Sequence, residues 1–310
     1  MRTTLAVLAV LLLVTACGST PPPSQPLRSA TAGGVPAGCG RAPGVPVGAT
    51  STQSLSSGGY QRSYLVHLPA GYQQGRPAPV VLVFHGRKGT GDDIEKYSGI
   101  DGLDAVAVYP RGLPASDGET AWQGAPGASP TDDVRFVADL LDRLAQTLCL
   151  DPARVYATGK SEGAGFTALL ACRLPDRIAA FATVSGAFYP ATGQGCGGSP
   201  PVPLLDLHGT ADPVIHYAGG ASHRLAYPAM PDWLRGWAGH NHCAGSGDTA
   251  IGTDVTRTTW TGCAPGSTLV HYRIAGGGHT WPGATAPSGP GGVTHTVSAT
   301  AVMWSFFTSL

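Results

Sequence analysis

The stretch VYATGKSEGAG at residues 155–165 places a Gly-x-Ser-x-Gly motif between a β-rich run, residues 154–158, and an apolar helical pattern, residues 166–172. A strand, a sharp turn and a helix in this order are what a nucleophile elbow requires. We expect Ser161 at the tip of the turn, in a strained backbone conformation. Gly159 and Gly163 leave room there, because a Cβ at either position would collide with the neighbouring strand or helix. The helix that follows would point its first backbone N–H groups at developing negative charge.

The Gly-x-Ser-x-Gly motif alone has low specificity, because the chain holds 45 Gly among 310 residues. The strands and helices predicted around the motif make the interpretation more specific. Alternating and buried-type apolar runs predict strands at residues 61–68, 79–84, 105–109, 179–184, 202–207 and 268–274, and helices at residues 131–148, 231–238 and 297–307. Thr131 is the expected cap of the first of these helices. The alternation predicts an α/β fold, a mostly parallel central sheet with helices on both faces.

The amino-terminal residues have the pattern of an export signal. Arg2 precedes an apolar run at residues 5–14, which is too short for an ordinary membrane span, so residues 1–16 are predicted to be a signal peptide. The sequence VTAC at residues 14–17 resembles a lipobox with Cys17 as the lipid acceptor, and an ordinary cleaved signal peptide is the alternative. Residues 17–38 are rich in Pro, Ser and Gly and are expected to be a tether, followed by one catalytic domain at residues 39–310.

Charge and cysteine content restrict the class of protein further. The formal net charge is zero and charged residues make up 12%, which gives no basic field for nucleic acid. Apart from Cys17 the cysteines form an even set of six, which in an exported chain suggests up to three disulfides with fifteen connectivities, and buried free thiols are the alternative. With no Cys-x-x-Cys pair, no metal or cofactor is expected. We expect an exported monomer that meets a membrane only through its lipid.

A serine hydroxyl needs a base to take its proton, and the base needs an acid to orient it. In an elbow fold the chain order is Ser, Asp or Glu, then His. Asp212 follows the buried run 202–207 and is the predicted acid, although a turn-forming role would also explain Asp-Pro. Asp132 and Asp133 precede the elbow and are better explained as helix-capping residues. His279, in GGGHTWPG after the last predicted strand, is the predicted base.

The remaining histidines and the tryptophans have weaker claims. His85, His208 and His271 are expected to be core or loop histidines. The predicted oxyanion hole combines the backbone N–H of Glu162 with that of Gly86 or Arg87, in the loop after residues 79–84. Trp122 and Trp281 are candidates to line the substrate pocket, with simple packing as the alternative.

The segments FHGRKGTGDD, TDDVRFVADLLDRL, VYATGKSEGAG, LHGTADPVIHY and GGGHTWPG resemble the secreted polyhydroxybutyrate depolymerase and feruloyl esterase family. The resemblance runs from about residue 39 to the end of the chain. It implies the α/β-hydrolase fold, carboxylic-ester hydrolysis, and Ser161, Asp212 and His279 as nucleophile, acid and base. It also implies the disulfides Cys39–Cys149, Cys172–Cys196 and Cys243–Cys263.

Glu162 departs from the family pattern, in which an amide or Met usually follows the serine. A carboxylate that faced the oxyanion would oppose its formation. We therefore expect the Glu162 side chain to point away, toward solvent, Lys160 or Arg87.

Three functions agree with these patterns. The first is a lipid-tethered serine esterase acting on short-chain, hydroxycinnamoyl or hydroxyalkanoate esters, including those derived from plant polysaccharide. The second is an acyltransferase that uses the same chemistry. The third is a non-catalytic carbohydrate-binding lipoprotein, which an intact set of catalytic residues disfavours.

The Cys17 hypothesis predicts that the mature protein partitions into detergent, because an acyl chain on Cys17 would bind it to lipid. Replacing Cys17 with Ala should release the protein or block its processing, as measured by Triton X-114 partitioning. A water-soluble wild-type protein whose mature chain begins at another residue would contradict the hypothesis.

Overall fold

The computed structural model describes residues 36–310, so the predicted signal peptide, Cys17 and most of the predicted tether lie outside the described residues. The strands of its main sheet are β1 (Thr50–Ser57), β2 (Tyr60–His67), β3 (Ala78–Phe84), β4 (Val106–Pro110), β7 (Leu150–Lys160), β8 (Ala180–Val184), β9 (Pro203–Gly209), β12 (Gly245–Ile251), β13 (Val255–Thr261) and β14 (Thr268–Ile274).

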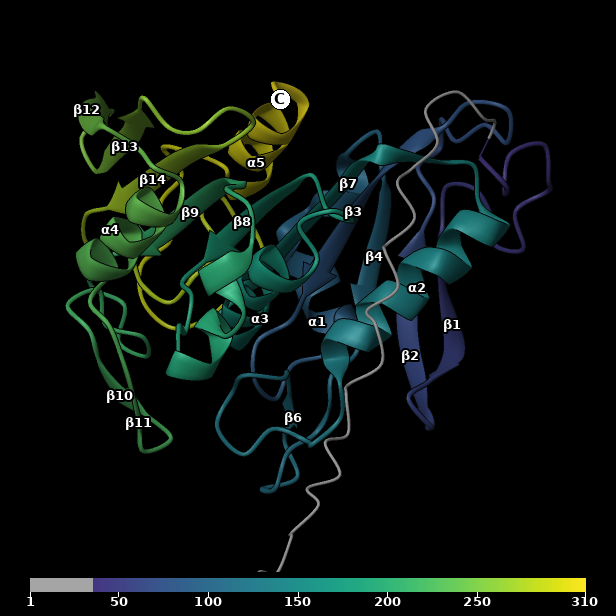
Figure 1. Ribbon diagram of the computed structural model, residues 1–310, viewed down its shortest axis with the longest axis horizontal. Coiled ribbons are helices and arrows are strands. Elements are labelled where there is room, and N and C mark those ends of the chain that lie inside the picture. Colours follow the sequence, from purple (N-terminus) through teal and green to yellow (C-terminus); the bar gives the residue numbers. More distant parts are fainter. Residues whose placement is uncertain (1–35) are drawn as a thin grey trace, which may run out of the picture. The chain divides into compact units, whose positions relative to one another are not determined.

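These strands form one ten-stranded sheet in the order β1-β2-β4-β3-β7-β8-β9-β14-β13-β12 (Figure 1). From β4 across to β14 every neighbouring pair is parallel. The pairs toward the two edges are antiparallel. The carboxyl ends of the parallel strands therefore meet along one edge, which is where loops form a site in a sheet of this kind.

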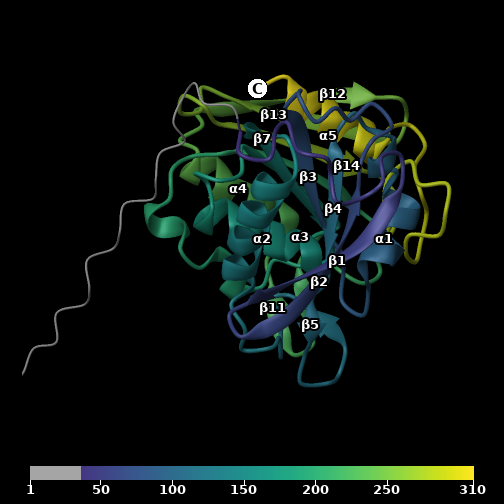
Figure 2. The ribbon, with the colours of Figure 1, turned by 90° about the vertical axis from the view of Figure 1, so that its right-hand side faces the viewer.

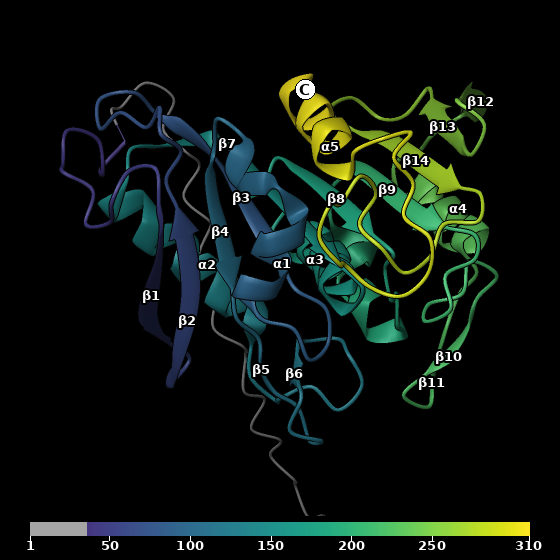
Figure 3. The same cartoon turned by 180° about the vertical axis from the view of Figure 1, so that it is seen from behind.

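Helices cover both faces of the sheet. The helices are α1 (Gly91–Ser98), α2 (Asp133–Thr147), α3 (Glu162–Arg173), α4 (Met230–His240) and α5 (Ala299–Thr308). Helices α2, α3 and α4 lie on the face toward the viewer in Figure 1, whereas α1 and α5 lie on the face seen in Figure 3. Figure 2 views the sheet from its β1–β2 edge, with α2 and α3 on one side and α1 on the other. No helix among residues 36–310 is long and apolar enough to cross a membrane.

The alternation of side chains along β3 explains why two helix layers form. Val80, Leu82 and Phe84 pack in the core beneath α2, α3 and α4. Val81 and Val83 pack in the second core, beneath α1 and α5. Since successive side chains of a strand point to opposite faces, a continuous apolar run needs a cover on each side. The structure thus confirms the predicted α/β-hydrolase architecture.

Two short hairpins accompany the sheet, β5 (Leu113–Pro114) with β6 (Thr120–Ala121), and β10 (Gly220–Ser222) with β11 (Leu225–Tyr227). Both lie toward the same end of the sheet in Figures 1 and 3. Three short 3-10 helices complete the elements: η1 (Ile100–Gly102), η2 (Pro190–Gly193) and η3 (Cys196–Gly198).

Helix α2 begins one residue later than its predicted cap implies. The Asp132 side chain, and not that of Thr131, caps the helix by accepting a hydrogen bond from the Arg135 N–H at 2.9 Å. Asp133 enters the core and forms an ion pair with Arg62 at 2.7 Å, where both side chains are buried. The Thr131 prediction was wrong because an aspartate one position further on caps equally well.

Three disulfides join Cys39 to Cys149, Cys172 to Cys196 and Cys243 to Cys263. This is the pairing that the family resemblance implied. The first bridge spans 110 residues of sequence, whereas the other two span 24 and 20. A longer closed loop removes more conformational entropy from the unfolded chain, so the first bridge should stabilise the fold most.

Alkylation of the native protein should therefore find no free thiol among the six bridged cysteines, as measured by mass spectrometry without reduction. Replacing both Cys39 and Cys149 with Ala should lower the free energy of unfolding by roughly 4–5 kcal/mol, against roughly 3 kcal/mol for the Cys243 and Cys263 pair as the matched control. Two or more alkylated thiols in native protein would contradict the bridges.

Candidate active site

Ser161 lies in the tight turn between β7 and α3. Its backbone has φ 58° and ψ −121°, a conformation that is unfavourable for a residue with a side chain. Two hydrogen bonds hold it, from the Ser161 N–H to the Val184 carbonyl and from the Ala187 N–H to the Ser161 carbonyl, both at 3.0 Å. The turn is therefore fixed by the end of β8 and the residues that follow it, and it presents the serine hydroxyl at the carboxyl end of the sheet.

The glycines on either side of Ser161 are required by close contacts. A Cβ on Gly159 would overlap the Gly163 carbonyl, and a Cβ on Gly163 would overlap the Phe84 carbonyl. These contacts agree with the predicted reason for glycine at both positions. They also bring α3 directly against the end of β3, so the loop after β3 lies beside Ser161.

Asp212 and His279 meet at the same edge of the sheet. The His279 Nδ1 lies 2.8 Å from the Asp212 Oδ2, and both side chains are buried. The Asp212 Oδ1 accepts hydrogen bonds from the N–H groups of Val214 and Ile215, each at 2.8 Å. Asp212 is thus fixed by its own turn, and it holds the imidazole so that Nε2 faces away from the carboxylate.

Burial and hydrogen bonding keep this pair in the ionisation states that a base and its orienting acid need. Burial alone would raise the pKa of Asp212, but the hydrogen bonds from His279 and from the Ile215 and Val214 N–H groups outweigh it and lower the pKa below 3.8. Burial also lowers the pKa of His279 below 6.5, against the opposing effect of Asp212. At neutral pH Asp212 is therefore ionised and His279 neutral.

The other histidines of the sequence prediction have structural partners. His85 bonds the Gly86 carbonyl at 2.7 Å and accepts from the Gly112 N–H at 3.0 Å, and burial lowers its pKa to about 4. His208 bonds the Ile215 carbonyl at 2.8 Å. These contacts agree with the expectation that both are core or loop residues.

A second His–Asp pair lies away from Ser161. His271 on β14 is 2.8 Å from Asp206 on β9 through Nδ1, and its Nε2 is 3.0 Å from the Tyr217 hydroxyl. His271 and Asp206 are both buried within the sheet, and neither residue lines the cavity that contains Ser161. Asp206 was not predicted as a partner of His271, because it lies inside an apolar strand.

The loop after β3 supplies the groups expected for an oxyanion hole. A Cβ built on Gly86 would lie 3.7 Å from the Ser161 Oγ, so this backbone approaches the serine hydroxyl closely. Within residues 36–310, no group accepts a hydrogen bond from the backbone N–H of Glu162, Gly86 or Arg87. Free N–H groups near a serine are available to a developing negative charge.

The Glu162 side chain is buried and points to Arg87. Of the three directions predicted for it, the one toward Arg87 is therefore confirmed, and the one toward solvent is wrong. Its Oε1 accepts a hydrogen bond from the Arg87 Nη1 at 3.1 Å, and its Oε2 has no partner among residues 36–310. Burial raises the pKa of Glu162 to about 7, although the Arg87 charge opposes the shift. Arg87 also binds Asp117 at 2.5 Å and Glu119 at 2.9 Å.

A cavity of about 520 Å³ contains Ser161 and His279. The loop after β3, helix α1, the β10–β11 hairpin and the loop after β14 contribute its walls, and its lining includes Arg87, Tyr97, Lys160, Glu162, Tyr189, Ser222, His223 and Pro290. Lys160, Tyr189 and His223 were not predicted from sequence. Lys160 carried one signal, a charged residue at the end of a buried strand, directly before the serine.

Trp122 and Trp281 do not line this cavity, so their prediction as pocket residues was wrong. Trp122 is fully buried, stacks on Phe166 and donates to the His85 carbonyl at 2.8 Å. Trp281 is buried in the other core and donates to the Thr300 hydroxyl at 3.1 Å. Both indoles pack against the sheet, and their N–H groups have partners inside the protein.

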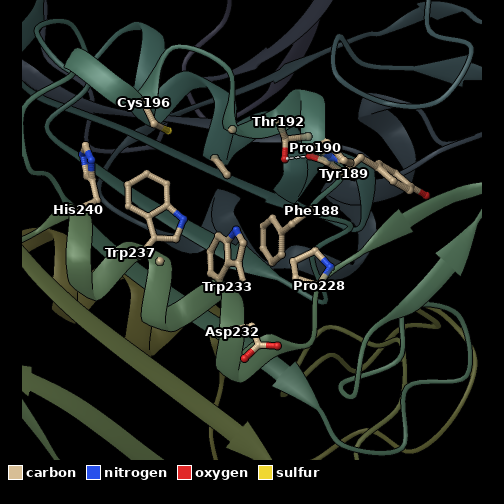
Figure 4. A pocket seen from close by; sticks show the side chains of 13 residues that line it. Phe188, Tyr189, Pro190, Thr192, Cys196, Pro228, Asp232, Trp233, Trp237 and His240 are labelled. Atoms are coloured by element: carbon tan, nitrogen blue, oxygen red, sulfur yellow. Dashed lines mark hydrogen bonds between the residues drawn. The ribbon is translucent and has the colours of Figure 1, made fainter.

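A second hollow of about 370 Å³ lies between α4 and the segment that follows β8 (Figure 4). Phe188, Trp233 and Trp237 form its apolar wall, with the Phe188 and Trp233 rings stacked. Tyr189 lines both this hollow and the cavity of Ser161. None of the three predicted catalytic residues lines the second hollow, whereas Ser161 and His279 line the first.

Comparison with known proteins agrees with this geometry. The family model described as Esterase PHB depolymerase matches residues 62–238. This chain belongs to that esterase family. It is therefore a carboxylic ester hydrolase.

Individual relatives of this esterase have related activities in their names. Feruloyl esterase D of Neurospora crassa is 30% identical, over 78% of this chain and 81% of its own length. Feruloyl esterase C of Emericella nidulans is 28% identical, over 87% of this chain and 90% of its own length. The solved structure of the acetyl xylan esterase from Aspergillus awamori superposes with a TM-score of 0.58 at 18% identity, covering 74% of this chain and 94% of that one.

The Arg87 contact generates a prediction for Glu162. Because Arg87 neutralises its charge, replacing Glu162 with Gln should change kcat for p-nitrophenyl acetate by only about fivefold between pH 6 and 9. Glu119→Gln is the matched control, since Glu119 also binds Arg87 but does not line the cavity. A gain of about a hundredfold at pH 8, about 2.7 kcal/mol, would instead mean that the Glu162 charge opposes the transition state.

Proposed function

We propose that this esterase is an exported serine hydrolase in which Ser161, His279 and Asp212 act as nucleophile, base and orienting acid. The observation that carries the proposal is the Asp212–His279 hydrogen bond of 2.8 Å at a cavity lined by both His279 and the strained Ser161. A side chain held in an unfavourable conformation by two backbone hydrogen bonds is typical of a functional position.

In the proposed reaction the Ser161 Oγ attacks the ester carbonyl while the His279 Nε2 takes the hydroxyl proton. The carbonyl oxygen becomes an oxyanion, which accepts hydrogen bonds from the free N–H groups of Glu162 and Arg87 or Gly86. Asp212, ionised through its hydrogen bonds, stabilises the imidazolium.

The tetrahedral intermediate then collapses, the acyl C–O bond breaks, and His279 returns the proton to the leaving alcohol. A water molecule, deprotonated by His279, attacks the acyl-enzyme. The ester bond between the acyl group and the Ser161 Oγ then breaks, His279 returns the proton to Oγ, and the carboxylic acid is released.

The proposed substrates are short-chain, hydroxycinnamoyl or hydroxyalkanoate esters, which include those derived from plant polysaccharide. The names of the feruloyl and acetyl xylan esterases support this range. Three disulfides support an oxidising compartment, and so export, with anchoring through Cys17 as part of the proposal.

The alternatives differ in measurable products. An acyltransferase would pass the acyl group to an added alcohol in preference to water, which product analysis with a sugar acceptor would reveal. A non-catalytic carbohydrate-binding protein would not react with a fluorophosphonate probe. The neutral His279 beside an ionised Asp212 favours a catalytic role over the non-catalytic alternative, because this pair can activate a serine.

The triad proposal predicts that Ser161→Ala and His279→Ala each lower p-nitrophenyl acetate turnover by roughly 10⁴-fold or more without loss of folding, as checked by circular dichroism. The double variant should lose little more, since the residues act as one unit. Asp212→Asn should cost somewhat less. A Ser161→Ala variant that keeps more than about a tenth of wild-type activity would overturn the proposal.

The pH profile gives an independent check on His279. Protonated His279 cannot accept the serine proton, so kcat/KM should fall as pH drops through the pKa of His279. Because burial lowers that pKa, the midpoint of the acid limb should lie below 6.5. A midpoint well above 6.5 in the rate measurements would show that another group is the base.

A further inference from the structure

Lys160 is a buried ammonium that the proposed reaction does not use. It is the last residue of β7, it is 6% exposed, and it lines the cavity of Ser161. Within the described part of the chain, no group accepts a hydrogen bond or forms an ion pair with its Nζ. The buried guanidinium of Arg62, by contrast, pairs with Asp133 at 2.7 Å. Buried charges are usually paired, so a partner for Lys160 is to be sought in a ligand.

The Lys160 Nζ lies close to the loop that carries His279. A Cβ on Gly289 would lie 3.1 Å from the Lys160 Nζ and would overlap the His279 carbonyl. The ammonium therefore lies on the His279 side of Ser161. Glu162 and Arg87 form their ion pair beside the predicted oxyanion groups, so the two charged neighbours of Ser161 have different surroundings.

The charge on Lys160 persists at neutral pH. Burial lowers its pKa to about 8, while the nearby Asp212 carboxylate acts in the opposite direction. The ammonium in turn adds to the lowering of the pKa of His279, for which burial is the first cause. Since Asp212 is already bonded to His279 and to two backbone N–H groups, it does not serve as the partner of Lys160.

The reaction places one part of the substrate beside this ammonium. His279 gives its proton to the leaving oxygen, so the leaving alcohol must lie against His279. A substituent on that alcohol is then carried toward the Lys160 Nζ. An ammonium without a partner in the protein binds a carboxylate more strongly than a neutral polar group, because the hydrogen bond is charge-assisted.

We propose that Lys160 binds an anionic group on the leaving alcohol, so that the preferred substrates are esters whose alcohol part carries a carboxylate, as in an ester of a hydroxy acid or of a uronic acid. This inference rests on the proposed function, because it needs His279 beside the leaving oxygen. Hydrolysis then releases a carboxylic acid from the acyl side and a hydroxy-carboxylate from the alcohol side. It makes Lys160 a determinant of specificity.

The experiment compares two esters with the same acyl group, 3-acetoxypropanoate and its neutral amide, 3-acetoxypropanamide. Wild-type kcat/KM should be at least about tenfold higher for the anion, mainly through a lower KM. Lys160→Met should remove this preference, so that the ratio of kcat/KM for the two esters falls to about one. Lys88→Met is the matched control, because Lys88 lines the same cavity but is 70% exposed and pairs with Glu119, and it should leave the preference intact.

Product inhibition gives a second measurement that needs no variant. The anion 3-hydroxypropanoate should inhibit p-nitrophenyl acetate hydrolysis at least about tenfold more strongly than 3-hydroxypropanamide. Lys160→Arg should keep part of both preferences, because it keeps the positive charge.

The outcomes separate this inference from the proposed function. A wild-type enzyme that hydrolyses both esters equally, or a Lys160→Met variant that keeps the preference, would overturn the role of Lys160 and leave the serine esterase intact. If Lys160→Met shifts the pH profile equally for both esters at an unchanged ratio, Lys160 only tunes His279 and the inference is wrong. A wild-type enzyme that hydrolyses no ester at all would refute the proposed function itself.

Discussion

The site depends on the contact between the turn at Ser161 and the carbonyl of Phe84 at the end of β3. Only a glycine at position 163 allows that approach, and it brings the amino end of α3 against the neighbouring loop. The serine hydroxyl, the first N–H groups of α3 and the backbone of Gly86 are all located by this contact. The unfavourable backbone of Ser161 is held by hydrogen bonds with Val184, the last residue of β8, and with Ala187 in the segment that follows.

The two charged residues beside Ser161 are treated differently by the fold. Glu162 forms an ion pair with an arginine that Asp117 and Glu119 also bind, and burial still raises its pKa to about 7. Lys160 is as deeply buried but has no such partner among the described residues. One side of Ser161 therefore carries an ion pair within the protein, and the other carries an ammonium without a partner among the described residues.

The sequence predicted those parts of the fold in which local pattern and burial agree. The buried runs of β3, β8 and β9 are continuous and apolar, and they were located to within about two residues. Strands β12 and β13 were missed, because sequences such as GSGDTAI are small and polar and lie at an exposed edge. Helix α1 was missed because its apolar face is a single buried Ile94 beside Gly91 and Ser98.

For the candidate site, chain order led to the prediction of Ser161, Asp212 and His279, because the order of such residues follows from the fold. Contacts between residues on different strands and loops could not be predicted from chain order. The packing of Trp122 and Trp281 in the two cores and the pairing of Glu162 with Arg87 depend on which loops meet, and residues far apart in sequence decide that.

The bridge from Cys39 to Cys149 has a mechanical consequence. Cys39 lies where the described domain begins, and Cys149 directly precedes β7, the strand that ends at the turn of Ser161. A pull on the chain ahead of Cys39 would be transmitted through the sulfur atoms to the start of the central strand. Strands β1 and β2 lie between the two cysteines and would carry none of that tension, because the bridge bypasses them. A force on the amino-terminal segment, such as flowing liquid exerts on a tethered protein, would therefore not unfold the sheet from its β1 edge.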